Sequence, residues 1–387
     1  MNIEFADRVK RLPPYLFAEI ERLIKEKKAQ GVDLISLSIG DPDLPPPQFV
    51  IEALMEEVAD LKNHNYSFSQ GEPDFRQAVS DWYKKRFHVD LGQDQVVALV
   101  GSKEGIANIG RAFVNAGDRV LVPDPAYPVY ANGTTILNDA VPVSMPLLEE
   151  NGFKPDFDAV DAEKVKMMFL NYPNNPTAAT VDIKFLKEAV EFAVDNNIIL
   201  CYDNAYSEIS FDGYKPPSIL EIDGAMEVVV EFHSCSKTFS MTGDRIAFAV
   251  GNKQIISGLT KVKSQVDSGP PVYIQKVAAK ALQSYVSDEP PEFLEKNNQI
   301  YAERRDVLVE RLCQMGFECE RPKATFYVWT NCKSNSMEFA TKLLDVGVAV
   351  TPGTGFGPHG ENYVRFALTQ PKERIEEACK RMSTLLG

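Results

Sequence analysis

Short apolar runs alternate with helical stretches through the middle of this chain, and that alternation restricts its fold more than any other feature. The runs lie at Val96–Val100, Arg119–Val122, Val165–Leu170, Ile198–Tyr202, Val228–Phe232 and Ile246–Val250. Apolar strands of this length with helices between them are typical of a mostly parallel sheet that helices cover on both faces. The sequence therefore predicts an α/β core.

The pattern changes after Gly251. A long polar helical stretch at Glu303–Met315 is followed by an apolar run at Thr325–Thr330 and by a final strand at Tyr363–Leu368 with a helix after it. A chain of 387 residues has room for two or three domains. We therefore expect a smaller α+β domain after the α/β core.

Composition excludes several classes of function. Asp and Glu number 55 against 41 Lys and Arg, a formal net charge of −14, which argues against general binding to nucleic acid or to anionic membranes. No run approaches 18 apolar residues, and the start MNIEFADRVKRLPPYLF lacks the apolar core of a signal peptide, so we expect a cytoplasmic protein. Six cysteines without a CxxC pair and four histidines without ligand spacing predict free thiols and no metal site.

The most informative motif follows the run Val228–Phe232. It reads HSCSKTFSMTGDR and places Lys237 among hydroxyl side chains, with Arg245 eight residues later. This arrangement suits an amine that forms an imine beside a phosphate clamp. Such an amine needs a lowered pKa, which a desolvated pocket or a nearby cation supplies. A single lysine is usually a solvated surface residue, and only these neighbours favour the reactive interpretation.

Three further strand ends carry polar groups, and ligands in parallel sheets bind beyond the carboxyl ends of strands. Ser102 opens a helix whose first amides could hold a phosphate, although it could also be a plain N-cap. Asp203 and Tyr206 follow another strand, and a buried Asp203 would need a cation such as a protonated ring nitrogen; the alternative is a turn aspartate. The segment Asn171–Thr177 offers side-chain amides or is simply a tight loop.

Taken together, these motifs resemble the fold-type I, class I and II aminotransferases, which carry pyridoxal 5′-phosphate. SCSKTFSMTGDR is similar to the lysine signature S-x-S-K-x-x-x-x-x-G-x-R, and NYPNNPT and YDNAY are similar to two further family motifs. The resemblance spans nearly the whole chain. It implies a large domain with a mostly parallel seven-stranded sheet between helices, plus a smaller α+β domain. The expected parts are an N-terminal segment 1–45 that contributes to the small domain and a substrate loop, a cofactor-binding domain 46–285 and a small domain 286–387.

The resemblance also assigns roles at the cofactor ring. It implies that Lys237 forms the imine with the cofactor and then moves a proton between the substrate Cα and the cofactor C4′ atom. Asp203 would pair with the pyridine N–H and keep the ring protonated, so that the ring can accept electrons from Cα. Asn175 and Tyr206 would contact the ring O3′. Lys237, Asp203 and Tyr206 are therefore the expected catalytic residues.

Other positions match the family at the phosphate, at the carboxylate and across a dimer. The implied phosphate contacts come from Ser102 and Lys103, through their backbone, and from Ser234 and Arg245. Tyr127 in PDPAYPVY would stack on the ring. Tyr66 resembles the tyrosine that reaches the partner subunit's phosphate, which implies a homodimer with shared active sites. Arg365 in YVRFAL would grip the substrate α-carboxylate, a bidentate contact that suits a guanidinium.

Four segments narrow the resemblance to the LL-diaminopimelate aminotransferase family: RLPPYLFAEI, SIGDPDLPPP, GSKEG and VDSG (Val266 to Gly269). That family makes LL-2,6-diaminopimelate from tetrahydrodipicolinate, with glutamate as amino donor, in lysine biosynthesis. The resemblance implies further substrate-binding residues beside Arg365, namely Asn175, Tyr15, Gly40, Lys103 and Tyr127. The chain departs from the family at Asp244, where members commonly carry Trp. We expect the Asp244 side chain to point to solvent and the clamp at Arg245 to survive.

Other functions are compatible with the same motifs. The substrate could be aspartate, alanine or an aromatic amino acid, as in other class I and II aminotransferases. A lyase or decarboxylase of the same fold would carry the same lysine, aspartate and phosphate clamp. A regulator that binds the cofactor without catalysis would need a DNA-reading segment, but the enzyme-like region begins almost at the first residue.

Overall fold

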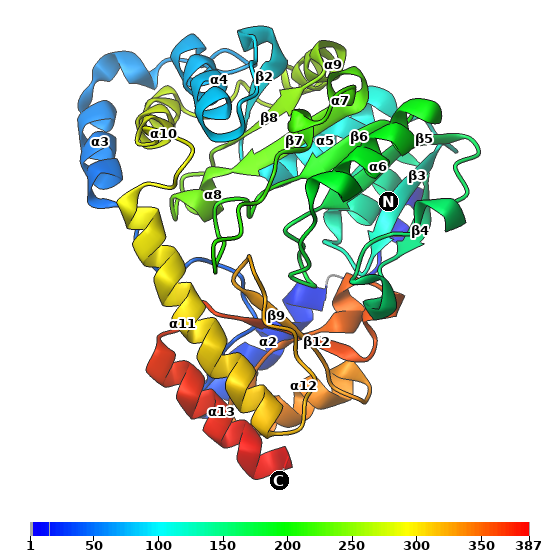
Figure 1. Cartoon of the computed structure of the whole chain (residues 1–387), viewed down its shortest axis with the longest axis vertical. Helices are drawn as coiled ribbons and strands as arrows, with labels where there is room; N and C mark the ends of the chain where they lie inside the picture. Colours follow the sequence, from blue (N-terminus) through cyan, green and yellow to red (C-terminus); the bar gives the residue numbers. More distant parts are fainter. Residues whose placement is uncertain (1–2, 15, 387) are drawn as a thin grey trace.

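The computed structural model describes residues 3–14 and 16–386, without the side chains of residues 16–19 and 386. Two lobes are visible in Figure 1, a larger one built around a sheet and a smaller one below it that contains the C-terminal helices. Tyr15, which the sequence predicts to bind substrate, lies outside the described residues.

A seven-stranded sheet forms the centre of the large lobe, with strand order β2-β8-β7-β6-β5-β3-β4. Its strands are β2 (Val96–Leu99), β3 (Arg119–Asp124), β4 (Val141–Pro146), β5 (Val165–Asn171), β6 (Ile199–Asp203), β7 (Val229–Ser234) and β8 (Ala247–Gly251). All pairings are parallel except those that β8 makes with β2 and β7. The prediction of a mostly parallel seven-stranded sheet is confirmed.

Helices cover both faces of this sheet. On one face α4 (Pro73–Phe87), α6 (Ile183–Asp195) and α10 (Val272–Gln283) pack in the largest apolar core. The other face holds α5 (Ser102–Phe113) and α9 (Lys253–Lys263) in a second core. The helix α3 (Gln48–Ala59) packs on α10 at the outside. Burial on both faces explains why the inner strands read as continuous apolar runs, whereas the mostly exposed edge strand β4 does not.

The small lobe combines both ends of the chain. Its three-stranded antiparallel sheet has the order β11 (Thr351–Pro352), β12 (Tyr363–Ala367), β9 (Tyr327–Asn331). Around it lie α11 (Glu292–Gln314), α12 (Ser336–Asp345), α13 (Lys372–Leu386) and, from the N-terminal part, α2 (Leu16–Ala29). Strand β1 (Ile35–Ser36) pairs in parallel with β10 (Val348–Ala349). The N-terminal segment thus contributes to this lobe, while the boundaries at residues 45 and 285 stay predictions.

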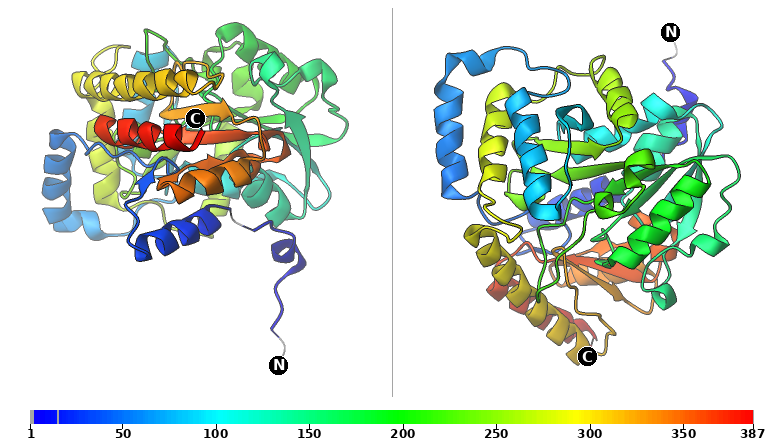
Figure 2. Two further views of the ribbon diagram at one scale, coloured as in Figure 1. Left: turned by 90° about the horizontal axis from the view of Figure 1, so that it is seen from below. Right: turned by 45° about the horizontal axis from the view of Figure 1, so that its top comes forward.

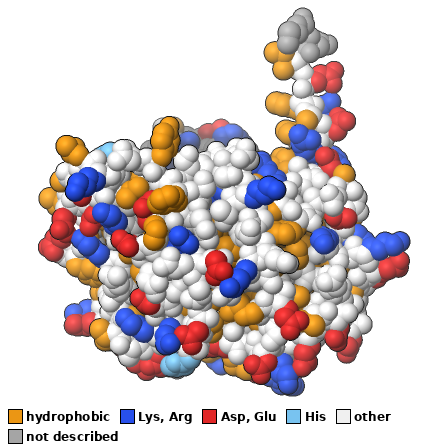
Figure 3. Space-filling model, turned by 90° about the horizontal axis from the view of Figure 1, so that it is seen from above, with side chains coloured by type: hydrophobic (Ala, Val, Ile, Leu, Met, Phe, Trp, Pro, Cys, Tyr) orange, Lys and Arg blue, Asp and Glu red, His pale blue; other side chains and the backbone are white. Residues whose placement is uncertain are grey.

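The first described residues extend away from the body of the molecule (Figures 2 and 3). They contain α1 (Asp7–Lys10), and Arg11 next to it forms an ion pair with Asp139 of the large lobe. Ile3 and Phe5 are 86% and 75% exposed. This arm therefore presents apolar side chains to its surroundings.

One helix begins earlier than the sequence suggests. The pattern predicts helix from Glu303, but α11 begins at Glu292, after an N-cap at Pro291. Its first turn carries Glu292 and Glu295, which suits the positive end of a helix dipole. The polar run Glu295–Gln299 that follows interrupts the apolar periodicity, so the sequence pattern misses this part of the helix.

The carboxyl ends of the central parallel strands meet at one edge of the sheet and face the small lobe. Asn171, Asp203 and Ser234 are the last residues of β5, β6 and β7. Short α8 (Cys235–Thr238) follows β7 and carries Lys237. The sheet alone thus brings together three of the sequence motifs.

A fully buried carboxylate, Glu231 of β7, lies behind this edge. Its Oε1 accepts hydrogen bonds from Tyr83 Oη at 3.0 Å and Asn204 Nδ2 at 2.9 Å, and lies 2.8 Å from His233 Nε2. Its Oε2 accepts a hydrogen bond from Ser218 Oγ at 2.6 Å. Burial alone would raise the Glu231 pKa, but hydrogen bonds, led by that of His233, hold it below its usual range. The carboxylate therefore links Tyr83 of α4 to Asn204, the residue after Asp203.

Glu231→Ala should lower the free energy of unfolding by roughly 3 kcal/mol, because it leaves several buried donors without an acceptor. Urea denaturation of the variant and the wild type measures the difference. Glu227→Ala, which removes a nearby exposed carboxylate, is the matched control and should leave the midpoint almost unchanged. An unchanged midpoint for Glu231→Ala would show that these hydrogen bonds contribute little.

Candidate active site

A cavity of about 290 Å³ lies between the two lobes, and residues from both lobes line it. Ten of the residues predicted from the sequence lie in its wall: Gly40, Ser102, Lys103, Tyr127, Asn175, Asp203, Tyr206, Ser234, Lys237 and Arg365.

Lys237 reaches the cavity from α8. Its Nζ donates a hydrogen bond to the backbone carbonyl of Gly40 at 2.9 Å. Burial lowers the pKa of its amine to about 8, and the positive charges of Arg365 and Arg245 act in the same direction. A larger fraction of this amine is therefore neutral near physiological pH than in a solvated lysine, as a nucleophile or base requires.

Asp203 ends β6 and is 5% exposed. Its Oδ2 accepts a hydrogen bond from Tyr130 Oη at 2.7 Å, whereas Oδ1 is buried and has no hydrogen-bond partner in the described part of the chain. Burial raises the pKa of this carboxyl to about 6, although the Tyr130 hydroxyl opposes the shift. A buried carboxylate with one open oxygen is suited to a charged N–H donor.

Arg365 of β12 faces these groups from the small lobe and is 3% exposed. Its Nη1 donates to Asn175 Oδ1 at 2.6 Å and its Nη2 to the Ser38 carbonyl at 2.8 Å. The guanidinium carbon lies 4.1 Å from the ring centre of Tyr327 and 4.8 Å from that of Phe356. Aromatic rings and fixed acceptors thus hold the plane of a guanidinium that could bind a carboxylate.

The segment 38–43 runs between Lys237 and Arg365, because its carbonyls at Gly40 and Ser38 accept the hydrogen bonds of these two cations. Gly40 is required there, since a Cβ would collide with the Tyr327 hydroxyl. Farther along, Asp43 receives a bidentate contact from Arg304 of α11, at 2.8 Å for both N–O pairs. The small lobe therefore fixes this segment.

A cradle for an anion lies at the start of α5. Gly101 has φ +83° and its open side faces the Arg245 guanidinium, so that a Cβ there would collide with Arg245. Arg245 donates through Nη1 to the Thr242 carbonyl at 2.8 Å and through Nη2 to the Val100 carbonyl at 3.4 Å. Burial and Arg245 both lower the pKa of Lys103. The first amides of α5 therefore lie beside two cations, Lys103 in the cavity wall and Arg245 behind Gly101.

Asp244 does not divert the clamp. Among the ion pairs of the described residues, none joins Asp244 to Arg245. The Asp244 side chain is half-buried, and burial raises its pKa. The expectation that it points freely to solvent therefore holds only in part.

Two predicted residues lie apart from the cavity wall. Arg245 is exposed and stands behind Gly101, and Tyr66 is 92% exposed on the surface of the large lobe. The Tyr66 side chain therefore takes no part in the cavity of its own chain.

Sequence reasoning missed Tyr130 and Tyr327. Tyr130 lies three residues after Tyr127 in the motif PDPAYPVY, and this spacing could have indicated a second ring on the same side. Tyr327 lies on β9, and its hydroxyl is 3.1 Å from that of Tyr206. No sequence signal shows Tyr327, because its position depends on how β9 pairs with β12.

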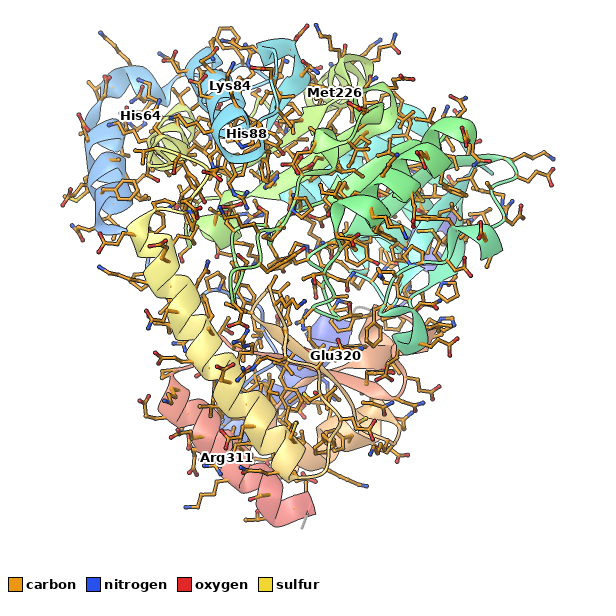
Figure 4. The ribbon with its side chains drawn as sticks, in the orientation of Figure 1. His64, Lys84, His88, Met226, Arg311 and Glu320 are labelled. Atoms are coloured by element: carbon orange, nitrogen blue, oxygen red, sulfur yellow. The ribbon has the colours of Figure 1, made fainter. Side chains whose placement is uncertain are left out.

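Histidines and cysteines do not gather at the cavity. Figure 4 shows His64 and His88 on the large lobe, away from the space between the lobes. Among the residues with described positions, no group of three or more His, Cys, Asp and Glu could hold a metal ion. Within residues 3–14 and 16–386, no helix combines the length and apolar character needed to cross a membrane.

Known proteins with similar sequences show the family of this chain. The family model of aminotransferase class I and II matches residues 32–382. The chain belongs to this aminotransferase family. The recognition from the lysine motif is thereby confirmed, as is the expectation of an aminotransferase enzyme.

Similar proteins match this class I and II aminotransferase over its full length. An LL-diaminopimelate aminotransferase of Desulforudis audaxviator is 49% identical, covering 100% of this chain and 99% of the relative. One of Aquifex aeolicus is 48% identical, covering 99% of each. Among solved structures, substrate-bound BacF from Bacillus subtilis matches with TM-score 0.93 at 38% identity, covering 100% of this chain and 98% of that one. A double mutant of Thermus thermophilus aspartate aminotransferase matches with TM-score 0.93 at 28% identity, covering 99% and 100%.

The raised pKa of Asp203 predicts that the free energy of unfolding of the ligand-free protein depends on pH. Between about pH 4 and 6 the folded state holds a proton that the unfolded state has lost, so the wild type loses stability as pH rises through this window. Asp203→Asn carries no such proton, and its stability relative to the wild type should rise by up to about 3 kcal/mol between pH 4 and 7.5. Guanidinium unfolding at both pH values measures this; a pH-independent difference would contradict the buried ionised carboxylate.

Proposed function

We propose that this aminotransferase uses pyridoxal 5′-phosphate and transfers an amino group between LL-2,6-diaminopimelate and 2-oxoglutarate, with glutamate as the matching donor, in the lysine pathway of the cytoplasm. The observation that carries the proposal is the full-length similarity, at 46% to 49% identity, to relatives named LL-diaminopimelate aminotransferase. The cavity between Lys237 and Arg365 has the groups that an α-amino acid needs.

The residues present fit the cofactor. The buried, unpartnered Oδ1 of Asp203 matches a protonated pyridine nitrogen. Asn175 accepts from Arg365 through Oδ1, which leaves Nδ2 to donate to the ring oxygen, and Tyr206 lies in the same wall. Ser234 and the start of α5 would hold the phosphate with Arg245. When bound, the cofactor supplies an electron sink for the substrate Cα.

Lys237 is the base of the proposed reaction. Its amine would hold the cofactor and, when free, would take the proton from the substrate Cα. A pKa of about 8 leaves enough neutral amine for this task and enough basicity to hold the proton afterwards. The hydrogen bond to Gly40 keeps Nζ at the cavity wall.

Arg365 orients the substrate. A carboxylate has two oxygens, and the fork of a guanidinium matches both, so Arg365 would hold the α-carboxylate and direct Cα toward Lys237. Diaminopimelate carries a second carboxylate and ammonium at its far end. Lys103, whose Nζ lies 5.8 Å from the ring centre of Tyr127, offers a cation in the same cavity for that far carboxylate.

A homodimer is part of the proposal. Large apolar side chains are exposed along α3 and the segment after it, including Met55 (68%), Leu61 (84%) and Phe68 (64%). Large exposed apolar side chains are often covered at interaction sites, and we assign this surface to the contact between two copies of the chain. A second copy that covered this surface would also bury Tyr66 and could bring it to the partner's phosphate.

A second candidate is an aspartate-type aminotransferase, which the structural similarity to the Thermus thermophilus enzyme favours. Stopped-flow mixing of holoenzyme with LL-diaminopimelate, glutamate, aspartate or alanine distinguishes the two. We expect loss of the imine absorbance with LL-diaminopimelate and glutamate alone. Conversion by aspartate alone would support an aminotransferase but would refute LL-diaminopimelate as its substrate. Product analysis that found decarboxylation or elimination would instead indicate a lyase.

Two substitutions test the proposed roles. Lys237→Ala should lose the imine absorbance and lower kcat by at least about 10²-fold, because the general base is removed. Arg365→Lys should retain that absorbance but raise KM for the amino acid, because an ammonium cannot form the bidentate contact. Absorbance spectra and steady-state kinetics measure both. Turnover by Lys237→Ala near the wild-type rate would refute the assignment.

A further inference from the structure

We propose that Lys263 is a positioning residue for the phosphate end of the cavity, because its buried ammonium offsets the charge of Glu104 and so keeps the start of α5 able to bind a phosphate group. The proposal rests on the cofactor of the proposed function. Neither the lysine motif nor the other aminotransferase motifs include Lys263.

Lys263 is the last residue of α9, and its side chain is completely buried. Its Nζ donates to Glu104 Oε2 at 2.9 Å and to both oxygens of Asp267 at 3.1 Å. Glu104 belongs to the segment GSKEG and Asp267 to the segment VDSG. One buried cation thus joins two carboxylates: Glu104 is 159 residues away along the chain and Asp267 is four residues away.

Glu104 shapes the turn that would hold the phosphate. Its Oε2 accepts the backbone N–H of Val100 at 3.1 Å, and its Oε1 accepts from Asn108 Nδ2 at 2.6 Å. The Val100 carbonyl in turn receives Arg245 Nη2. Glu104 therefore fixes the backbone immediately before Gly101 and Ser102, where the first amides of α5 begin.

The same carboxylate would also repel a phosphate. Glu104 lies in the first turn of α5, and a negative charge there competes with an anion at the helix start. The buried ammonium of Lys263, which Glu104 shares with Asp267, offsets part of this charge while the Glu104 hydrogen bonds remain. The turn therefore keeps its shape without losing its attraction for an anion.

Asp267 extends the contact to a second loop. Its Oδ1 accepts the backbone N–H of Gly269 at 2.7 Å. Gly269 packs against the Phe68 carbonyl, where a Cβ would come within 2.8 Å. The segment 66–68, which contains the exposed Tyr66, therefore rests on a turn that Lys263 holds.

The test compares two probes on cofactor-stripped protein: pyridoxal 5′-phosphate, and pyridoxal, which lacks the phosphate. In Lys263→Met the dissociation constant for pyridoxal 5′-phosphate, measured by absorbance titration, should rise at least tenfold relative to wild type, while that for pyridoxal should change less than threefold. The double variant Lys263→Met with Glu104→Gln should recover most of the lost affinity, because the charge beside the start of α5 is gone and the cluster, with only Asp267 left, has the net charge of the wild type again.

Arg305→Met is the matched control. It removes an equally buried cation, which is paired with Asp212 far from the cradle, and the ratio of the two dissociation constants should stay at the wild-type value. If Lys263→Met does not fold, Glu104→Gln alone should bind pyridoxal 5′-phosphate at least as tightly as wild type, and a tenfold loss there would overturn the inference.

Equal weakening of both probes in Lys263→Met, or no recovery in the double variant, would show that Lys263 has only a structural role. Wild-type protein that bound neither probe would refute the proposed cofactor itself. The failure of this inference is therefore distinct from the failure of the proposed function.

Discussion

The buried carboxylate of Asp203 is the constraint around which the large lobe is organised. A carboxylate that is 5% exposed, with one oxygen that accepts no hydrogen bond from the described residues, is costly to keep ionised, and burial raises its pKa to about 6. Tyr130 satisfies the other oxygen, and the Glu231 network holds Asn204 immediately beside it. The fold thus keeps a charge in place that only a cationic partner balances fully.

The second half of the site depends on a segment of backbone rather than on side chains. The carbonyls of Ser38 and Gly40 receive Arg365 and Lys237, so the two cations are set relative to each other by one short stretch of chain. Arg304 holds the far end of that stretch through Asp43. Because Arg304 and Arg365 both belong to the small lobe, any movement of this lobe would carry the segment and the carboxylate site together.

Sequence reasoning succeeded where a chemical pattern coincides with the end of a buried strand. Asp203, Ser234 and Lys237 follow apolar runs that burial on both faces makes unmistakable, and their place at one sheet edge follows from parallel pairing. The edge strand β4 has no such run, and the polar run Glu295–Gln299 interrupts the apolar periodicity near the start of α11.

Residues whose role depends on tertiary pairing were not predictable in this way. Tyr327 reaches the cavity only because β9 pairs with β12, and Arg304 reaches Asp43 only because α11 packs beside the N-terminal segment. Lys263 looks like an ordinary polar residue in a helix until α9 is placed against α5. Tyr66 is 92% exposed on its own chain, so a role for it depends on the proposed second copy.

Charge around the cavity runs opposite to the charge of the whole chain. The chain has a formal net charge of −14, yet Lys103, Lys237 and Arg365 line the cavity and Arg245 stands behind it. The arginines lower the pKa values of the two lysines. Burial lowers the pKa of Lys237, and the charges of Arg365 and Arg245 lower it further; burial and the charge of Arg245 lower the pKa of Lys103. The three cations in the wall outnumber its two carboxylates, Asp203 and Glu21, and a concave site with an excess of positive charge concentrates anionic ligands. The same clustering of positive charge therefore attracts a phosphate and a carboxylate and leaves the lysine amine poised to react.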